Sequence, residues 1–193
     1  MSIQFRPGQK SDCEVLAQMM NIASGGIFEY LFGTIKPGLT AVEVVAENMV
    51  NDHSYRSDIV AVSNDNIVGM ARSFPSAYHR ISPDARVYFP DDRLNYLAEF
   101  FETRVENSWY LNTLCVLPDH RRQGIGEKLI ELAKSKAVEK GFDTISLMVF
   151  QDNRSALSLY RRTGFQVVQT IDLIPNEHIR HEGGCLLMKA AVF

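Results

Sequence analysis

Gly124 and Gly126 stand just after a basic Arg121-Arg122-Gln123 stretch, at a point where strand-like spacing gives way to helical spacing. Free backbone amides at a helix N-terminus, together with the helix dipole, attract anions. Glycines remove the Cβ atoms that would keep a phosphate away from those amides, and Arg121, Arg122 and Lys128 add positive charge. The spacing predicts a pyrophosphate site. A glycine-rich helix cap beside a solvated basic cluster is the alternative.

Two better-known phosphate motifs fit this segment poorly. The glycines do not follow the GxGxxG spacing with an acidic residue further along the chain, which disfavours a Rossmann dehydrogenase. No Lys-Ser or Lys-Thr pair follows to hold a magnesium ion, which disfavours a nucleotide triphosphatase.

Asn153 and Tyr160 form a second candidate pair. They are seven residues apart, almost two helical turns, so their side chains share one face of a helix and can contact one extended ligand. Two plainer interpretations stay open: Asn153 caps the helix, and Tyr160 is a core aromatic.

Arg121-Arg122-Gln123-Gly124-Ile125-Gly126 resembles the signature motif of the GNAT superfamily of N-acetyltransferases, which is Arg or Gln, two residues, Gly, one residue, then Gly or Ala. The stretch from Asn153 to Phe165, with its Tyr160 and Gly164-Phe165, is similar to the second motif of that family. The two motifs occur in the order and spacing of the family, and the resemblance covers about Ser108 to Val168.

The resemblance implies a mixed α/β fold, with a mostly antiparallel central sheet, splayed central strands and helices on both faces. It also implies a binding site for acetyl-coenzyme A. The backbone of Leu114, Cys115 and Val116 would bond the pantetheine arm, Asn153 would contact the same ligand, and Tyr160 would protonate the departing thiolate. The pyrophosphate would lie against the segment whose members are Arg121, Arg122, Gln123, Gly124, Ile125, Gly126 and Glu127.

The implied activity is acetyl transfer from the thioester to a primary amine, by direct attack in a ternary complex. The alternative is an inactive acyl-coenzyme A-binding sensor or structural module. The presence of Tyr160 favours the enzyme. A small-molecule or peptide amine is the expected acceptor, and no metal is expected.

The attacking amine must be neutral, which calls for a base. No Asp or Glu lies between Trp109 and Val116. Tyr110 and Asn112 would share one face of that strand by two-residue periodicity, so they are the first candidates on the acceptor side. Glu106, just before the strand, is a further candidate that would act directly or through water.

The pattern of elements predicts one domain over residues 1–193 with an insertion at 75–107. Ser11 and Thr40 each precede a Glu three residues later, as helix caps do, and Asn64-Asp65-Asn66 predicts a hairpin turn. The expected strands are 2–6, 58–63, 67–74, 108–116, 144–150, 166–174 and 184–191. The expected helices are 11–23, 40–51, 91–104, 124–140 and 153–163, with a short aromatic-rich piece at 27–32.

Composition excludes several classes of protein. The net charge of −3 and the absence of a long basic block argue against nucleic acid and anionic membranes as partners. No long apolar run or signal-like N-terminus occurs, so a cytoplasmic location is expected. Cys13, Cys115 and Cys185 are expected to be buried free thiols. The spacing of His79, His120, His178 and His181 does not predict a metal site. A homodimer is compatible with the sequence.

Overall fold

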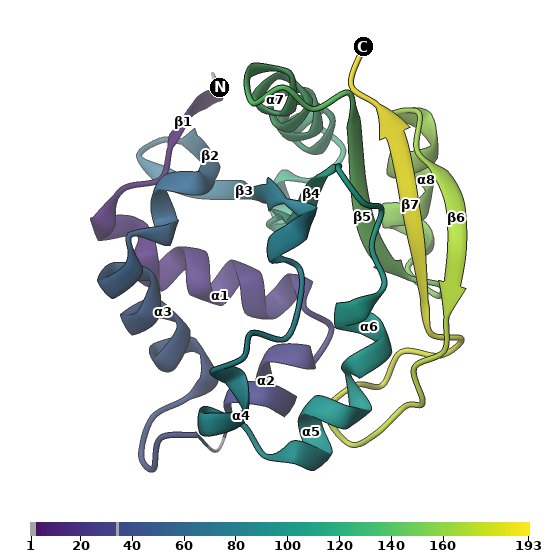
Figure 1. Cartoon of the computed structure of the whole chain (residues 1–193). Coiled ribbons are helices and arrows are strands. Elements are labelled where there is room, and N and C mark those ends of the chain that lie inside the picture. The colour runs from purple at the N-terminus through teal and green to yellow at the C-terminus, as the bar shows by residue number, and fades with distance from the viewer. Residues whose placement is uncertain (1–2, 34) are drawn as a thin grey trace.

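The computed structural model describes residues 3–33 and 35–193 (Figure 1). Its strands are β1 (Gln4–Pro7), β2 (Asp58–Ser63), β3 (Asn66–Pro75), β4 (Trp109–Val116), β5 (Thr144–Phe150), β6 (Gln166–Ile171) and β7 (Cys185–Ala191). The α-helices are α1 (Cys13–Ala23), α2 (Ile27–Phe32), α3 (Ala41–Asp52), α4 (Ala85–Tyr88), α5 (Asp91–Tyr96), α6 (Ala98–Glu102), α7 (Ile125–Glu139) and α8 (Arg154–Arg162). Short 3-10 helices are η1 (Lys10–Asp12), η2 (Ser54–Ser57), η3 (Ser76–Tyr78) and η4 (Pro118–His120).

The strands of the described residues form one sheet in the order β1-β2-β3-β4-β5-β7-β6. Every neighbouring pair is antiparallel except β4 and β5, which run parallel. Helices α7 and α8 pack on one face of the sheet, and α1 and α3 pack on the other (Figure 1). The expected mixed α/β fold, with a mostly antiparallel sheet and helices on both faces, is confirmed.

Local signals in the sequence predicted several elements correctly. Thr40 caps α3, because its hydroxyl accepts the Glu43 amide at 3.2 Å while the Glu43 carboxylate accepts the Thr40 amide at 2.8 Å. Asn64 and Asp65 have left-handed backbones, with φ of 47° and 62°, in the turn between β2 and β3. Both features depend on residues within a few positions of each other.

The cap expected at Ser11 is wrong. The chain first forms η1, and the Asp12 carboxylate accepts the backbone amide of Gln9 at 2.8 Å. Asp12 also receives two hydrogen bonds from Arg6, at 2.6 and 3.1 Å, so an ion pair with the first strand holds this turn. The predicted first strand began at Ser2, which lies outside the described residues.

The helix expected from Asp91 to Arg104 is two shorter helices, α5 and α6, which meet at Leu97. Leu94 and Leu97 are buried in the same cluster as Phe150 of β5. The carbonyl of Phe100, which would accept the Arg104 amide in a continuous helix, accepts a hydrogen bond from His79 at 2.9 Å instead. A tertiary contact therefore ends this helix early. The assignment of one domain with an insertion at 75–107 stays a prediction.

Strands β4 and β5 pair only at their beginnings, where Trp109 lies opposite Ile145 and Tyr110 opposite Ser146. Beyond these pairs, no residue of β4 or β5 is paired with the other strand. We call the space between the two strands beyond Tyr110 the fork. On its other side β4 stays paired with β3 up to Val116. The splayed central strands that the family resemblance implies are therefore present.

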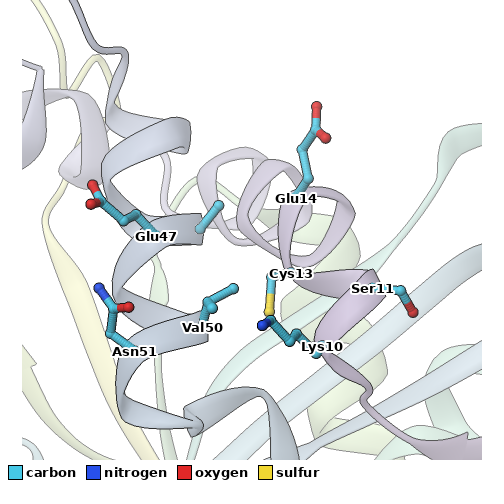
Figure 2. A pocket seen from close by; sticks show the side chains of 8 residues that line it. Lys10, Ser11, Cys13, Glu14, Glu47, Val50 and Asn51 are labelled. Atoms are coloured by element: carbon cyan, nitrogen blue, oxygen red, sulfur yellow. The ribbon is translucent and has the colours of Figure 1, made fainter.

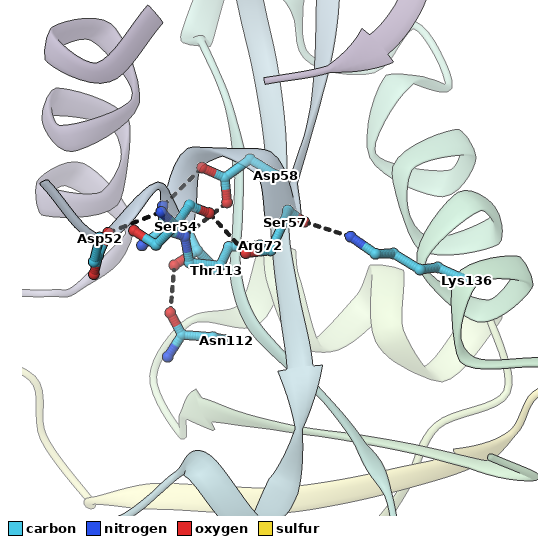
Figure 3. Close-up of polar contacts among 8 residues, drawn as sticks. All are labelled: Asp52, Ser54, Ser57, Asp58, Arg72, Asn112, Thr113 and Lys136. Atoms are coloured by element: carbon cyan, nitrogen blue, oxygen red, sulfur yellow. Dashed lines mark hydrogen bonds and ion pairs between the residues drawn. The ribbon is translucent and has the colours of Figure 1, made fainter. Parts of the chain in front are cut away.

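A β-bulge interrupts β4 at Asn112, because Arg72 pairs with Thr113 while Ser73 pairs with Leu111. The Arg72 guanidinium donates two hydrogen bonds, of 2.7 and 2.8 Å, to the carboxylate of Asp58 on the neighbouring strand β2 (Figure 3). The Asp58 side chain is 0% exposed. Because a bidentate pair of this kind fixes the guanidinium plane, we infer that it stabilises the pairing of β2 with β3 beside the bulge.

Candidate functional site

The fork leaves one edge of β4 open at Leu114, Cys115 and Val116. These residues pair with Ala71, Met70 and Gly69 of β3, and every second residue in such a ladder directs its N–H and C=O groups away from the partner strand. Among the described residues β5 supplies no partner on that side. The open edge can therefore accept an extended ligand as an additional strand.

The turn from η4 into α7 has backbone amides without partners. Among the described residues, the amides of residues 122–127 donate no hydrogen bond, whereas the next amide, of Lys128, donates to the Gly124 carbonyl at 3.0 Å. Arg121, Arg122, Gln123 and Gly124 are exposed. A run of free amides at the positive end of a long helix has the chemistry of an anion site. It is the place that the sequence predicted for a pyrophosphate.

The two glycines of the motif have different physical roles. Gly124 has φ of 80°, and a Cβ built on it would meet no atom within 4 Å, so the residue is required for its backbone conformation and leaves open space. A Cβ on Gly126 would lie 3.1 Å from Leu159 of α8 and 3.9 Å from Val116. Close packing of α7 against α8 therefore explains why residue 126 is a glycine. The sequence alone had predicted that both glycines make room for the phosphate.

Side chains around this turn are partly committed to other contacts. The Arg121 guanidinium donates to the Val116 carbonyl at 2.9 Å, so a ligand at this end of β4 must share that carbonyl or displace Arg121. Glu127 forms an exposed ion pair with Arg162 of α8 at 2.9 Å. Arg122 has a left-handed backbone with φ of 63°, which is costly for a residue with a Cβ. We infer that the backbone of this turn is strained at Arg122.

Asn153 and Tyr160 lie at the two ends of α8. The Asn153 side-chain oxygen accepts the Ala156 amide at 3.1 Å, which is the helix-capping role that the sequence left open. Tyr160 is 7% exposed, and its ring packs edge-on against Phe165 at 5.7 Å. Burial raises the pKa of Tyr160, with a smaller contribution from Cys115, so the phenol stays protonated at neutral pH.

Tyr110 and Asn112 have different surroundings. Tyr110 is 2% exposed and stacks on His79 at 4.2 Å, whereas Asn112 is exposed and its side-chain oxygen accepts the Thr113 hydroxyl at 3.0 Å. Asn112 is the extra residue of the bulge, which was not expected from the sequence because a regular strand was assumed. The prediction that the two residues share one face stays a prediction.

Glu106 is an exposed carboxylate before β4, paired with Arg104 at 2.9 Å. Sequence patterns missed His79, which is 3% exposed and surrounded by Tyr110, Phe100 and Phe101. Burial is the largest of the causes that lower the pKa of His79 to about 4. It therefore holds the 75–107 segment against β4 as a neutral ring. No short motif contains it, because its partners lie 21 or more residues further along the chain.

Two hollows lie elsewhere on the molecule. One of about 420 Å³ lies between α1 and α3 and is lined by Lys10, Ser11, Cys13, Glu14, Ala46, Glu47, Val50 and Asn51 (Figure 2). The other, of about 520 Å³, is lined by Val15, Ser63, Asn64, Asn66, Ile67, Val68, Leu117 and His120. None of the site residues predicted from the sequence lines either hollow.

Within residues 3–33 and 35–193, no three His, Cys, Asp or Glu side chains come together in a way that would hold a metal ion. In the same part of the chain, no helix has both the length and the apolar character needed to cross a membrane.

Comparison with known proteins places this geometry in a family. The model of the acetyltransferase (GNAT) family matches residues 36–165. Thialysine N-epsilon-acetyltransferase of Bos taurus is 39% identical over 57 residues, which are 30% of this chain and 34% of that protein. Mycothiol acetyltransferase of Corynebacterium jeikeium (strain K411) is 35% identical over 65 residues, which are 34% of this chain and 19% of that protein. The matched segments thus span well under half of these relatives.

Similar solved structures cover nearly the whole chain. An N-acetyltransferase from Staphylococcus aureus Mu50 has a TM-score of 0.69 at 15% identity and covers 97% of this chain and 99% of its own. The paia N-acetyltransferase from Thermoplasma acidophilum, in complex with coenzyme A, has a TM-score of 0.59 at 17% identity over 99% of each chain. These likenesses concern the fold. The match of the family model over residues 36–165 shows that the chain belongs to the acetyltransferase (GNAT) family.

Proposed function

We propose that this protein transfers an acetyl group from acetyl-coenzyme A to a primary amine, by direct attack of the amine in a ternary complex. The observation that carries the proposal is the run of unpartnered amides at residues 122–127 beside the open edge of β4. An anion site and an extended edge at one end of the fork suit a ligand that has a pyrophosphate and a peptide-like arm. The CoA complex of a structural neighbour supports this ligand.

The chain's own groups would bind this ligand mainly through the backbone. The amides of Arg122, Gln123, Gly124, Ile125, Gly126 and Glu127 would hold the pyrophosphate, with Arg121 adding charge. The open edge at Leu114, Cys115 and Val116 would hold the pantetheine arm, and Asn153, which caps α8, would contact the same ligand. When bound, acetyl-coenzyme A supplies an activated acetyl thioester. A backbone amide near the end of β4 would stabilise charge on the carbonyl oxygen.

Tyr160 is the proposed proton donor to the thiolate. Its raised pKa keeps the proton on the phenol at neutral pH, as a general acid requires. The same shift makes transfer to a thiolate uphill, because a thiol has an ordinary pKa of about 8.5. We therefore expect the contribution of Tyr160 to lie at the low end of general-acid effects.

The raised pKa of the Cys115 thiol favours direct attack by the amine over a mechanism with an acetyl-cysteine intermediate. Burial raises the pKa of the Cys115 thiol to about 11, so on the order of one molecule in ten thousand has the thiolate at pH 7. The thiolate is the nucleophilic form of cysteine. Cys115 is thus poorly suited to form a covalent intermediate.

The amine acceptor belongs to the opposite side of the fork from α7 and α8. The candidates from the sequence, Tyr110, Asn112 and Glu106, are respectively buried, exposed at the bulge, and ion-paired at the surface. Asn112 is therefore the best placed of the three to contact an acceptor directly. A relative named for thialysine supports a small amine, and a structural neighbour bound to a Gag peptide supports a peptide. A homodimer and a cytoplasmic location stay predictions.

One experiment separates the enzyme from the alternative of an acyl-coenzyme A sensor. Purified protein is mixed with acetyl-coenzyme A and, in separate reactions, spermidine, lysine, thialysine and a short peptide with a free α-amine. Release of free thiol that depends on the amine supports the transferase. Tight binding of acetyl-coenzyme A by calorimetry with no thiol release from any of the four would favour the sensor.

A further inference from the structure

Asp152 and His181 form a hydrogen-bonded pair at the end of β5 that the sequence patterns did not connect. The His181 Nδ1 atom lies 2.7 Å from the Asp152 carboxylate, and the two side chains are 31% and 40% exposed. A carboxylate only accepts hydrogen bonds, so Nδ1 is the donor. In the neutral ring this leaves the lone pair on Nε2, which has no hydrogen-bond partner among the described residues.

Ring stacking places this pair beside the fork. The His181 ring stacks on Phe150, the last residue of β5, at 3.9 Å and 13°. Phe150 and Met148 belong to the cluster that includes residues of α2, α5 and the 172–179 segment, whereas Leu147 and Val149 face α7 and α8. His181 therefore lies on the face of the sheet opposite to the unpartnered amides of residues 122–127.

The turn between α1 and α2 closes against the same ring. A Cβ on Gly25 would collide with the ring of Phe150 and would lie 2.7 Å from His181 Nε2. The imidazole thus lies where the α1–α2 turn, the end of β5 and the segment before β7 meet. The charged groups at this place are Asp152 after β5, and Arg180 and Glu182 beside His181 in sequence; Gly25 and Phe150 carry none.

We propose that His181 is the general base of the acetyl transfer, held in the productive tautomer by Asp152; this inference rests on the proposed function. The amine nitrogen bonds to the thioester carbonyl carbon, and the C–S bond breaks with its electron pair leaving on sulfur. The proton lost by the amine goes to His181 Nε2, directly or through one water, and the thiolate takes its proton from Tyr160. Atoms and charge then balance without another reactant.

The other candidate bases are less suited to this step. His79 is 3% exposed and donates its Nε2 proton to the Phe100 carbonyl, so it offers no accessible lone pair there. Glu106 lies before β4, at the end where β4 and β5 are still paired, and is bound to Arg104. The pair of Asp152 and His181 combines an oriented imidazole with a side chain that is 31% exposed.

Removal of the imidazole should leave its segment in place. The Glu182 amide donates to Asp152 at 3.1 Å, the Gln151 amide donates to the Gly184 carbonyl at 3.0 Å, and the Gln151 side chain donates to the Gly183 carbonyl. None of these contacts uses His181. His178→Gln is a matched control, because His178 is three residues away in the same segment and its side chain is 38% exposed.

The test compares His181→Gln, Asp152→Asn and His178→Gln with the parent protein, using whichever of the four amines above reacts fastest. For His181→Gln we expect kcat/KM for the amine to fall about 10²-fold, with the Kd for acetyl-coenzyme A within about twofold. Asp152→Asn should cause a similar loss, because an amide NH₂ selects the wrong tautomer. His178→Gln should stay within about threefold.

Full activity in His181→Gln would overturn the inference while the proposed function stands. An equal loss of acetyl-coenzyme A affinity, or a large fall in Tm, would overturn it in favour of a structural role. A parent protein that binds acetyl-coenzyme A but acetylates none of the four amines would instead overturn the proposed function, and this inference with it.

Discussion

The two sides of the fork present different kinds of surface. On the side of α7, the groups available to a ligand belong to the backbone: the amides of residues 122–127 and the open edge of β4. On the side of α1 and α2, side chains dominate, with Tyr110 stacked on His79 and His181 stacked on Phe150. The comparison shows that the groups on the α7 side are positioned by the backbone geometry of one turn and one strand. The groups on the α1 and α2 side are positioned by contacts between side chains that are far apart in the sequence.

The largest effect is expected for a substitution at the proposed anion site on the side of α7. Gly124→Val should weaken acetyl-coenzyme A binding by about 100-fold or more, because the side chain enters the open space where the anion is expected. Calorimetry measures the Kd.

Gly141→Val is the matched control for that substitution. Gly141 follows the other end of α7, with φ of 81° and an equally open surrounding, so it carries the same backbone cost of about 1–2 kcal/mol without a ligand. Equal affinity in the two variants would contradict the anion site. Gly126→Val should differ from both by also lowering Tm, since its side chain meets Leu159.

A smaller effect is expected at Tyr160, which packs in the cluster on the side of α7 and α8. Tyr160→Phe keeps the ring and its packing on Phe165, so the fold and the Kd for acetyl-coenzyme A should barely change. The value of kcat should fall about 10- to 100-fold, because the lost interaction forms in the transition state. Tyr110→Phe is the control, since it removes the hydroxyl of another buried phenol. If Tyr110→Phe loses kcat and Tyr160→Phe does not, the assigned proton donor is wrong.

On the side of α1 and α2, the role of His79 can be tested by measuring how the free energy of unfolding depends on pH. Its pKa of about 4 in the folded state lies below the ordinary value of 6.5, so the unfolded chain binds a proton that the native chain rejects between these values. Stability should therefore fall on acidification from about pH 6.5 to 4, by on the order of 3 kcal/mol at most. His79→Phe should remove most of this dependence.

At neutral pH, His79→Phe should cost about 1 kcal/mol for the lost hydrogen bond to Phe100. Urea unfolding of both proteins at pH 7.5 and pH 5 measures the change. If acidification destabilises both proteins equally, His79 is not the group responsible.

The smallest effect is expected from the acids of the 75–107 segment. Asp91 and Glu106 form exposed ion pairs with Arg86 and Arg104, and such pairs contribute about 0–1 kcal/mol. Neutralising Asp91, Asp92, Glu99, Glu102 and Glu106 together should raise the KM of a cationic amine about two- to threefold, with little change in the Kd of acetyl-coenzyme A. Equal changes in both constants would show that the acids act on the fold.

The sequence alone determined the features that depend on neighbours in the chain. The cap at Thr40, the turn at Asn64-Asp65, helix α7 and the motif around Gly124 follow from residue types a few positions apart. Backbone recognition of a phosphate is a local property of the same kind, because one turn and one helix end create it. The residues of the proposed anion site were therefore named from the sequence, whereas the packing of Gly126 against Leu159 was not.

Only the tertiary structure decided the side-chain contacts on the side of α1 and α2. The bulge at Asn112 depends on how β4 pairs with Arg72 and Ser73, and the sequence pattern of β4 alone did not predict it. Asp152 and His181 are 29 residues apart, and no periodicity connects them. Their contact forms because the segment before β7 returns along β5 to the start of α8, and a distance of that kind is set by the sheet as a whole.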